Sequence, residues 1–115
     1  MLSPRNRMRS SADFTETVRG GARGGGGTLM VHLNVGLTGE SPLVGFVVSK
    51  AVGNSVVRHR VQRQLRHLMR ERVNHVPAGA RVVVRALPSA AGTPSERLGR
   101  DLDTALSVAT RKVRR

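Results

Sequence analysis

The segment from Lys50 to Arg72 carries the densest group of side chains in the chain that can bind an anion. It holds seven basic residues and a single acid, Glu71. The basic residues are Lys50, Arg58, Arg60, Arg63, Arg66, Arg70 and Arg72. From Arg60 on, four of the arginines recur at steps of three and four residues, so on a helix they stack one turn apart and repel one another by about 0.2–0.5 kcal/mol per pair. Because no neighbouring acids offset this repulsion, we expect these groups to bind a phosphate backbone.

A solvated helix face is the ordinary interpretation of a run of charges, but such a face normally mixes both signs. The whole chain shares the imbalance of this segment. Its 115 residues include 20 Lys and Arg against 7 Asp and Glu, which gives a formal net charge of +13. Nearly all of the basic residues are Arg, whose planar guanidinium suits bidentate contacts with phosphate. The composition therefore favours a nucleic acid as the partner.

No set of side chains has the spacing of a self-sufficient catalytic site. Neither a Ser-His-acid set nor a pair of carboxylates can be assembled, and a nuclease that works alone normally needs carboxylates to hold metal. His67, Glu71 and His75 recur at four-residue spacing. A straight helix would hold the first and last of them about 12 Å apart, too far for one zinc ion. We therefore predict no catalytic residue and no metal site in the chain.

The composition also bounds the compartment and the number of domains. The chain has no cysteine, which fits a reducing cytoplasm. No stretch approaches the length of a membrane span, and the basic start of the chain is not followed by the apolar run of a signal peptide. We expect a cytoplasmic protein with no membrane partner, and a single RNA-binding domain over residues 1–115.

A long amphipathic helix must position the basic residues. The pattern predicts it from Asn54 or Ser55 to about Val76, with the arginines opposite its apolar stripe. The stripe consists of Val57, Val61, Leu65, Leu68, Met69 and Val73. At the start of the helix, Gly53 and Asn54 lie where free N–H groups and the positive end of the dipole favour anions.

Strands are predicted on both sides of this helix. Residues 28–35 alternate as a half-buried strand does, with His32 on the polar face. Residues 43–49 form a nearly continuous apolar run, which predicts a strand covered on both faces with Phe46 in the core. A third strand is predicted over 81–87.

Two further helices complete the prediction, over 12–19 and from the start signals Thr93-Pro94-Ser95-Glu96 onward. Residues 20–27 are so rich in glycine that we expect a mobile loop, in which Arg23 offers one charge to a phosphate. The order of elements predicts an α+β fold, an α/β sandwich of three helices on a small sheet.

The run SKAVGNSVVRHRVQRQLRHLMR, residues 49–70, resembles the signature of the protein subunit of bacterial ribonuclease P. In that family a strand ending in Ser-Lys leads through Val-Gly-Asn into an arginine-rich helix. The opening RNRMRSSADFTETVRGG resembles the N-terminal helix of the family, with Phe14 in the same place. The resemblance covers nearly the whole chain. It implies a small mixed sheet with three helices, a ribosomal-protein-like fold whose βαβ crossover is left-handed, against the usual rule.

The resemblance also implies a function. The chain would be the auxiliary, non-catalytic subunit of ribonuclease P, an RNA-based endonuclease that removes the 5′ leader of precursor tRNA. Its partners would be the catalytic RNA and precursor tRNA, with no obligate protein partner. The Mg²⁺ that serves the reaction would be held by the partner RNA and the substrate. The alternative is a structural RNA-binding protein of the ribosomal type, with the same charge and fold.

The resemblance places the RNA-binding residues on two surfaces. Phe14, the strand face of His32, and Lys50 would line a cleft for the single-stranded leader. The arginine-rich region would contribute Gly53, Asn54, Arg58, His59, Arg60, Arg63, Arg66 and Arg70. The chain departs from the family pattern at His59, where Asn is common, at Gln62 and Gln64, where basic residues are frequent, and at Val18, where a second Phe is common. With two Phe and no Tyr or Trp, stacking of leader bases would rest on Phe14, helped in part by His32.

Overall fold

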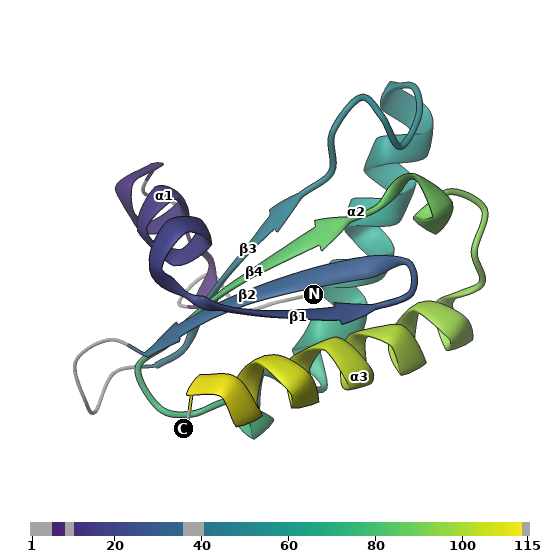
Figure 1. Cartoon of the computed structure of the whole chain (residues 1–115). Helices are drawn as coiled ribbons and strands as arrows, with labels where there is room; N and C mark the ends of the chain where they lie inside the picture. Colours follow the sequence, from purple (N-terminus) through teal and green to yellow (C-terminus); the bar gives the residue numbers. More distant parts are fainter. Residues whose placement is uncertain (1–5, 9–10, 36–40, 114–115) are drawn as a thin grey trace.

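The computed structural model describes residues 6–8, 11–35 and 41–113. The helices are α1 (Ser11–Gly20), α2 (Ser55–Arg70) and α3 (Ser95–Val113), and the strands are β1 (Ala22–Gly26), β2 (Leu29–Val35), β3 (Leu43–Val47) and β4 (Ala80–Ala86). Short 3₁₀ turns lie at Val73–His75 and Pro88–Ala90. The predicted α+β fold is confirmed (Figure 1). Within the described residues, no helix combines the length and apolarity that crossing a membrane requires.

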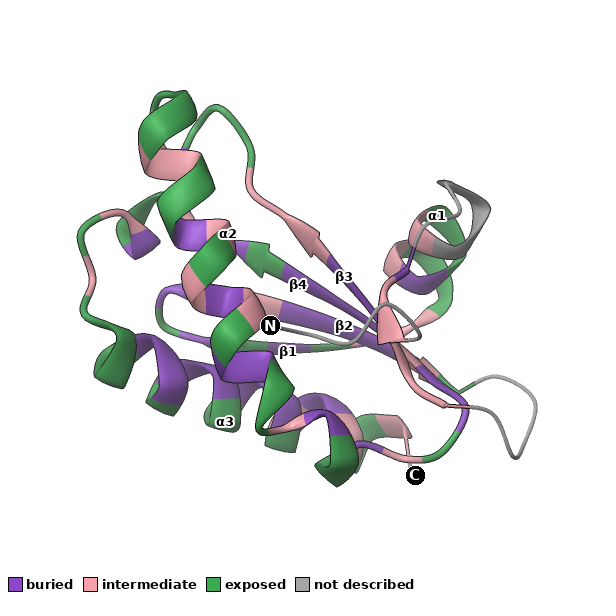
Figure 2. Ribbon diagram, turned by 180° about the vertical axis from the view of Figure 1, so that it is seen from behind, coloured by how far each residue is buried: buried purple, intermediate pink, exposed green. Residues whose placement is uncertain are grey.

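The four strands form one mixed sheet in the order β1-β2-β4-β3. β2 pairs antiparallel with β1 and β4, whereas β3 pairs parallel with β4. Two parallel strands need a crossover connection, which α2 provides. In Figure 2, α2 lies in front of the sheet, and β3 lies to the right of β4 when the arrowheads are turned upward. The β3–α2–β4 crossover is therefore left-handed, as the family resemblance implied.

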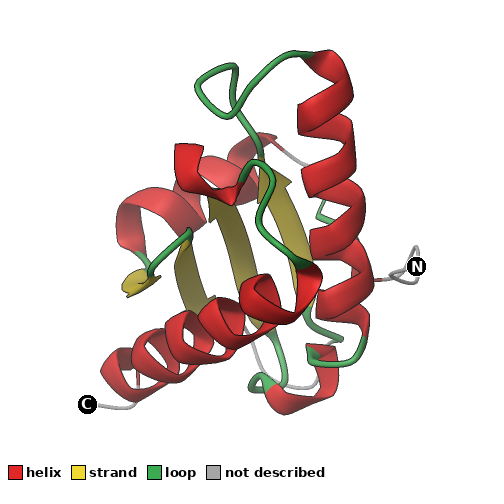
Figure 3. Cartoon of the chain, turned by 90° about the vertical axis from the view of Figure 1, so that its right-hand side faces the viewer, coloured by secondary structure: helices red, strands yellow, loops and turns green. Residues whose placement is uncertain are grey.

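The helices divide between the two faces of the sheet. α2 and α3 cover the face that carries Leu29, Val31 and Leu33, and their buried side chains join it in one hydrophobic core. The buried residues are Val61, Leu65, Leu68 and Met69 from α2 and Leu98, Leu102, Ala105, Leu106 and Ala109 from α3. α1 lies on the opposite face of the sheet (Figure 3). There the Phe14 ring occupies the place that a side chain at Gly45 would take.

The predicted loop at residues 20–27 is wrong, because most of this segment forms β1, a strand paired with β2 from Ala22↔Leu33 to Gly26↔Leu29. Its glycines are required by close packing. A Cβ at Gly24 would meet the backbone oxygen of Ala105, and one at Gly26 would meet that of Asp101. The α3 backbone therefore lies directly on β1, in a contact that no larger residue allows.

α2 ends at Arg70, six residues before the predicted end at Val76. The Arg72 guanidinium lies just beyond the helix and donates to the Leu68 carbonyl oxygen at 2.8 Å. It also donates to Asp103 Oδ1 on α3 at 2.6 Å. The helix end is thus capped by an arginine that an acid on another helix holds in place.

Candidate nucleic-acid interface

The outward side of α2 carries arginines without acidic partners. Arg60, Arg63 and Arg70 are exposed and Arg66 is half-buried. Among the described residues, carboxylates pair only with arginines elsewhere, namely Arg72 with Glu71 and Asp103, Arg97 with Asp101, and Arg100 with Glu96. In the described part of the chain, the positive charge of these arginines is therefore unpaired and available to a partner.

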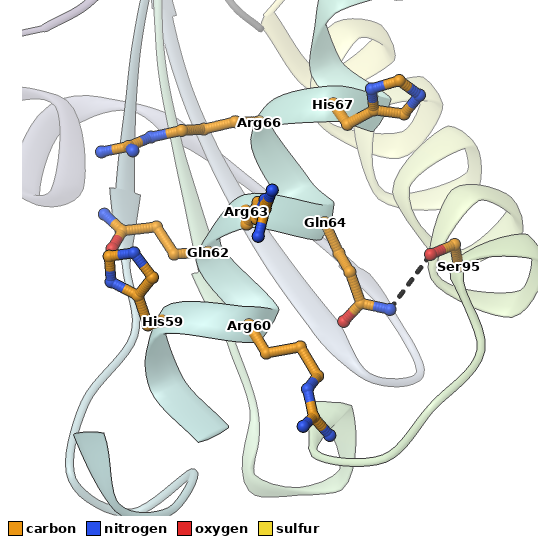
Figure 4. A pocket seen from close by; sticks show the side chains of 8 residues that line it. All are labelled: His59, Arg60, Gln62, Arg63, Gln64, Arg66, His67 and Ser95. Atoms are coloured by element: carbon orange, nitrogen blue, oxygen red, sulfur yellow. Dashed lines mark hydrogen bonds between the residues drawn. The ribbon is translucent and has the colours of Figure 1, made fainter. Parts of the chain in front are cut away.

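Three of these arginines, Arg60, Arg63 and Arg66, line an open hollow of about 640 Å³ on α2 (Figure 4). Its lining consists of His59, Arg60, Gln62, Arg63, Gln64, Arg66, His67 and Ser95. Gln64 Nε2 donates to Ser95 Oγ at 3.0 Å, which ties the start of α3 to the border of this basic surface. A second hollow of about 500 Å³ extends toward the start of the helix, along Ser55 and Val56. The lining contains donors and no carboxylate, as a surface for a polyanion requires.

The residues at the start of α2 build the helix end. Gly53 has φ +156°, and a side chain there would also meet Val57. Asn54 is the N-cap, and its Oδ1 accepts a hydrogen bond from the Val57 N–H at 3.0 Å. Arg58 is half-buried and donates to Ser55 Oγ at 3.4 Å. The structure therefore gives Gly53 and Asn54 a local role that fixes where the basic surface begins.

His32 lies away from the α2 surface, on the other face of the sheet. It is only 6% exposed, and its neighbours across the strands are Arg23 on β1 and Val83 on β4. Burial, and then the positive charges of Arg85 and Arg23, lower the pKa of His32 below its ordinary value. Its imidazole is therefore neutral at neutral pH.

Phe14 and Arg66 come together at the β3 edge of the sheet. Both line a small cavity of about 110 Å³ with residues of β3 and the N-terminal segment. The remaining lining residues are Arg7, Met8, Val44, Gly45, Phe46 and Gln62. Phe46 also packs partly buried against the core, as predicted. The cavity connects the α1 side of the sheet to the basic helix, whereas Lys50 is exposed in the turn after β3 and Arg70 at the far end of α2.

Two contributions to these surfaces did not follow from the sequence pattern. Ser95 reaches the α2 surface from another helix, which no local pattern signals. Arg85 shares a face with His32 through the pairing of β2 with β4. Arg81 and Arg85 lie four residues apart in the predicted strand 81–87, a spacing that puts both on one face, but this pattern does not show that the strand pairs beside His32.

The carboxylates do not gather into a metal site in the part of the chain that the structure describes, where no group of three or more His, Cys, Asp or Glu is placed to hold an ion. The Asp101 carboxylate is 11% exposed and accepts the Thr28 N–H and hydroxyl at 3.1 and 2.6 Å. The Thr28 hydroxyl, its N–H and Arg97 lower the pKa of Asp101, against an opposing effect of burial. Asp101 therefore stabilises the turn between β1 and β2.

Comparison with known families agrees with this arrangement. The family described as Ribonuclease P matches residues 2–110 of the chain. The chain belongs to the ribonuclease P protein family. The ribonuclease P protein component of Thermobifida fusca is 54% identical over 96% of this chain and 80% of its own length. That of Kocuria rhizophila is 51% identical over 97% of this chain and 98% of its own length.

Solved structures of ribonuclease P proteins share the fold. The Staphylococcus aureus protein superposes with a TM-score of 0.81 at 23% identity, over 90% of this chain and 94% of that one. The Thermotoga maritima protein gives 0.74 at 20% identity, over 93% and 97%. Ribonuclease P proteins of distant sequence thus share this arrangement of helices and sheet.

Proposed function

We propose that the outer face of α2 binds the catalytic RNA of ribonuclease P, and that the sheet face carrying His32 binds the 5′ leader of precursor tRNA. As a member of this family, the chain is a protein component of ribonuclease P and acts in the processing of tRNA 5′ ends. The observation that carries the proposal is the group of arginines on α2 with no carboxylate partner among the described residues.

The α2 surface suits a folded RNA. Its arginines repeat along one side of a 16-residue helix, so they can follow a phosphate backbone over several nucleotides. Contacts of this kind position an RNA without reading its sequence.

The opposite sheet face suits a single strand. Phe14 stands beside it and offers a ring for stacking, while Arg23 and Arg85 are exposed and offer charge. Aromatic stacking combined with a positive surface is the usual way in which proteins hold single-stranded nucleic acid. Because Phe14 is the only aromatic residue we assign to this face, we expect weak discrimination between leader bases.

We assign the cutting step to the RNA. The Asp101 carboxylate accepts a hydrogen bond from Thr28, and the Asp103 carboxylate accepts one from Arg72, so both carboxylates stabilise the fold. Mg²⁺ would be bound by the catalytic RNA and the substrate, where it supplies a Lewis acid and an activated water. The chain's own residues would bind and orient the two RNAs, in the cytoplasm, without an obligate protein partner.

The test is to add the purified chain to bacterial ribonuclease P RNA at low Mg²⁺ and to follow cleavage of precursor tRNA. We expect faster cleavage with the chain than with the RNA alone, and no cleavage by the chain alone. Cleavage without added RNA would contradict the assignment of catalysis to the RNA. Absence of stimulation would contradict the proposed role and favour a structural RNA-binding protein.

A further inference from the structure

We propose that Arg23, His32 and Arg85 form a phosphate site that takes a phosphodiester group of single-stranded RNA. The site lies on the sheet face opposite α2. Its assignment to the leader rests on the proposed function, because that face is where we place the leader.

The strand register brings the three residues together. Arg23 is the direct neighbour of His32, and Arg85 is the direct neighbour of Met30, two residues from His32 on the same face. Arg23 and Arg85 are thus two strand spacings apart across the sheet and two residues apart along it, which is about 12 Å in all. Two extended guanidinium side chains can reach one anion from that separation.

A glycine keeps the β1 side of this site free of a further side chain. Gly25 is exposed and pairs with Met30, so no β1 side chain stands in the row of Arg85. Arg23 and Arg85 are exposed, and neither takes part in an ion pair with a described carboxylate. Only the backbone carbonyl oxygen of Arg23 is engaged, by Lys112 Nζ at 2.7 Å. Both guanidinium groups are therefore available to a ligand.

His32 supplies the independent sign of a missing ligand. Its side chain is buried, and its Nδ1 has no hydrogen-bond partner. Buried polar atoms in folded proteins are usually paired, so an unpaired ring nitrogen beside two free arginines indicates a polar group that is bound in the complex. A phosphodiester oxygen can accept a hydrogen bond from the imidazole and from both guanidinium groups.

An anion here has a measurable consequence. Arg23 on β1 and Arg85 on β4 are the charges that lower the His32 pKa, whereas the described charged residues of α1, Glu16 and Arg19, are exposed. A phosphodiester between the two arginines would offset their charge and favour the imidazolium form. The His32 pKa should therefore rise when RNA binds.

The experiment follows the imidazole signals of the full-length chain by NMR over a pH series, alone, with a short oligouridylate and with inorganic phosphate. We expect oligouridylate to raise the His32 pKa, with the exposed His75 as an internal control. In R23A/R85A the free pKa should be higher and the rise on binding should vanish. The slope of log affinity against log salt should flatten by about 0.7, because the two arginines neutralise one phosphate of a single strand. R19A/R100A removes the same charge elsewhere and should keep the response.

Two outcomes would overturn the site. One is oligouridylate binding with an unmoved His32 pKa, and the other is R23A/R85A binding with the affinity and salt slope of the wild type. A His32 pKa that rises with inorganic phosphate but not with oligouridylate would overturn the RNA assignment. In the holoenzyme, R23A/R85A should weaken the binding of precursor tRNA that carries a leader. The binding of mature tRNA and of the catalytic RNA should not change. If the wild-type chain responds to oligouridylate but fails to stimulate cleavage, the phosphate site stands and its assignment to the leader fails.

Discussion

α2 and α3 are both long amphipathic helices rich in arginine, but they differ in whether those arginines have carboxylate partners. On α3, Arg97 contacts Asp101 at 3.2 Å and Arg100 lies 4.0 Å from Glu96. On α2, the arginines of the outer face have no carboxylate partner among the described residues. The pairing of arginines, more than their number, therefore separates a helix that serves the fold from a helix that serves a partner.

Arg72 marks the boundary between the two behaviours. It belongs to the same basic run of the sequence, but it lies beyond the end of α2 and its guanidinium pairs with Asp103. It is mostly buried, with 18% of its side chain exposed. We therefore assign Arg72 to the junction of the helices and leave it out of the RNA surface.

The largest expected effect on stability comes from the core side of α3. Leu102 is fully buried, so Leu102→Ala should lower the free energy of unfolding by about 2–5 kcal/mol. The salt dependence of RNA affinity should stay unchanged, because the charges of α2 are intact. Urea unfolding and RNA titrations at several salt concentrations measure both. A changed salt slope in the folded variant would break the proposed division of labour.

The matching change on α2 should have the reverse pattern. Replacing Arg60, Arg63 and Arg66 by Ala should flatten the salt slope by about two to three units and weaken binding of the catalytic RNA roughly 30- to 150-fold near physiological salt. Stability should change little. The control is the variant with Ala at Arg19, Arg100 and Arg111, which loses the same charge from α1 and α3. An equal loss of affinity in both variants would assign binding to net charge alone.

A smaller effect on stability is expected from the Asp101 carboxylate, a charge on α3 that stabilises the fold. Asp101→Asn should lower stability at pH 7 by about 1–3 kcal/mol, since Thr28 and Arg97 lose a charged acceptor. The folded pKa of Asp101 lies below its ordinary value of 3.8, so its contribution is complete above that value and is lost as pH falls through the folded pKa.

Acid unfolding curves check this sign. The wild type should lose more stability than Asp101→Asn as the pH is lowered below about 4. Glu16→Gln is the control, because its side chain is exposed and should matter less. Equal acid sensitivity of the wild type and Asp101→Asn would contradict the role given to this carboxylate.

The smallest effects should have opposite signs on the two helices. Arg63→Gln relieves repulsion with Arg60 and Arg66 and should raise stability by about 0.4–1 kcal/mol. Arg100→Gln removes the contact with Glu96 and should lower stability by about 0.3 kcal/mol. Thermal unfolding at low salt measures both. A loss of stability in Arg63→Gln would contradict the repulsion between arginines on α2.

The elements that are marked by their own local pattern of apolar residues or by helix start signals could be predicted from the sequence. The apolar stripe of α2, the alternation of β2 and the start signals before α3 each predicted the observed element. β1 was missed because its glycines are required by close contact with the α3 backbone. That contact joins segments about 80 residues apart in the chain. The early end of α2 was missed for a similar reason, since Asp103 holds Arg72 across 31 residues.

The candidate site divides in the same way. The arginines of α2 follow from spacing alone, so their shared surface was predictable. The neighbourhood of His32 depends on which strands pair, and that pairing is a long-range property. Arg85 therefore entered the site only when β4 was placed beside β2.

The glycine strand has a consequence for anyone who would engineer this protein. Residues 22–26 look like a spacer, an inviting place to insert a tag or to substitute a serine-rich linker. The direct seating of α3 on Gly24 and Gly26 makes them instead among the least replaceable positions on the sheet. An insertion there would lift the C-terminal helix from the sheet, whereas the exposed Gly25 between them can accept a labelled side chain.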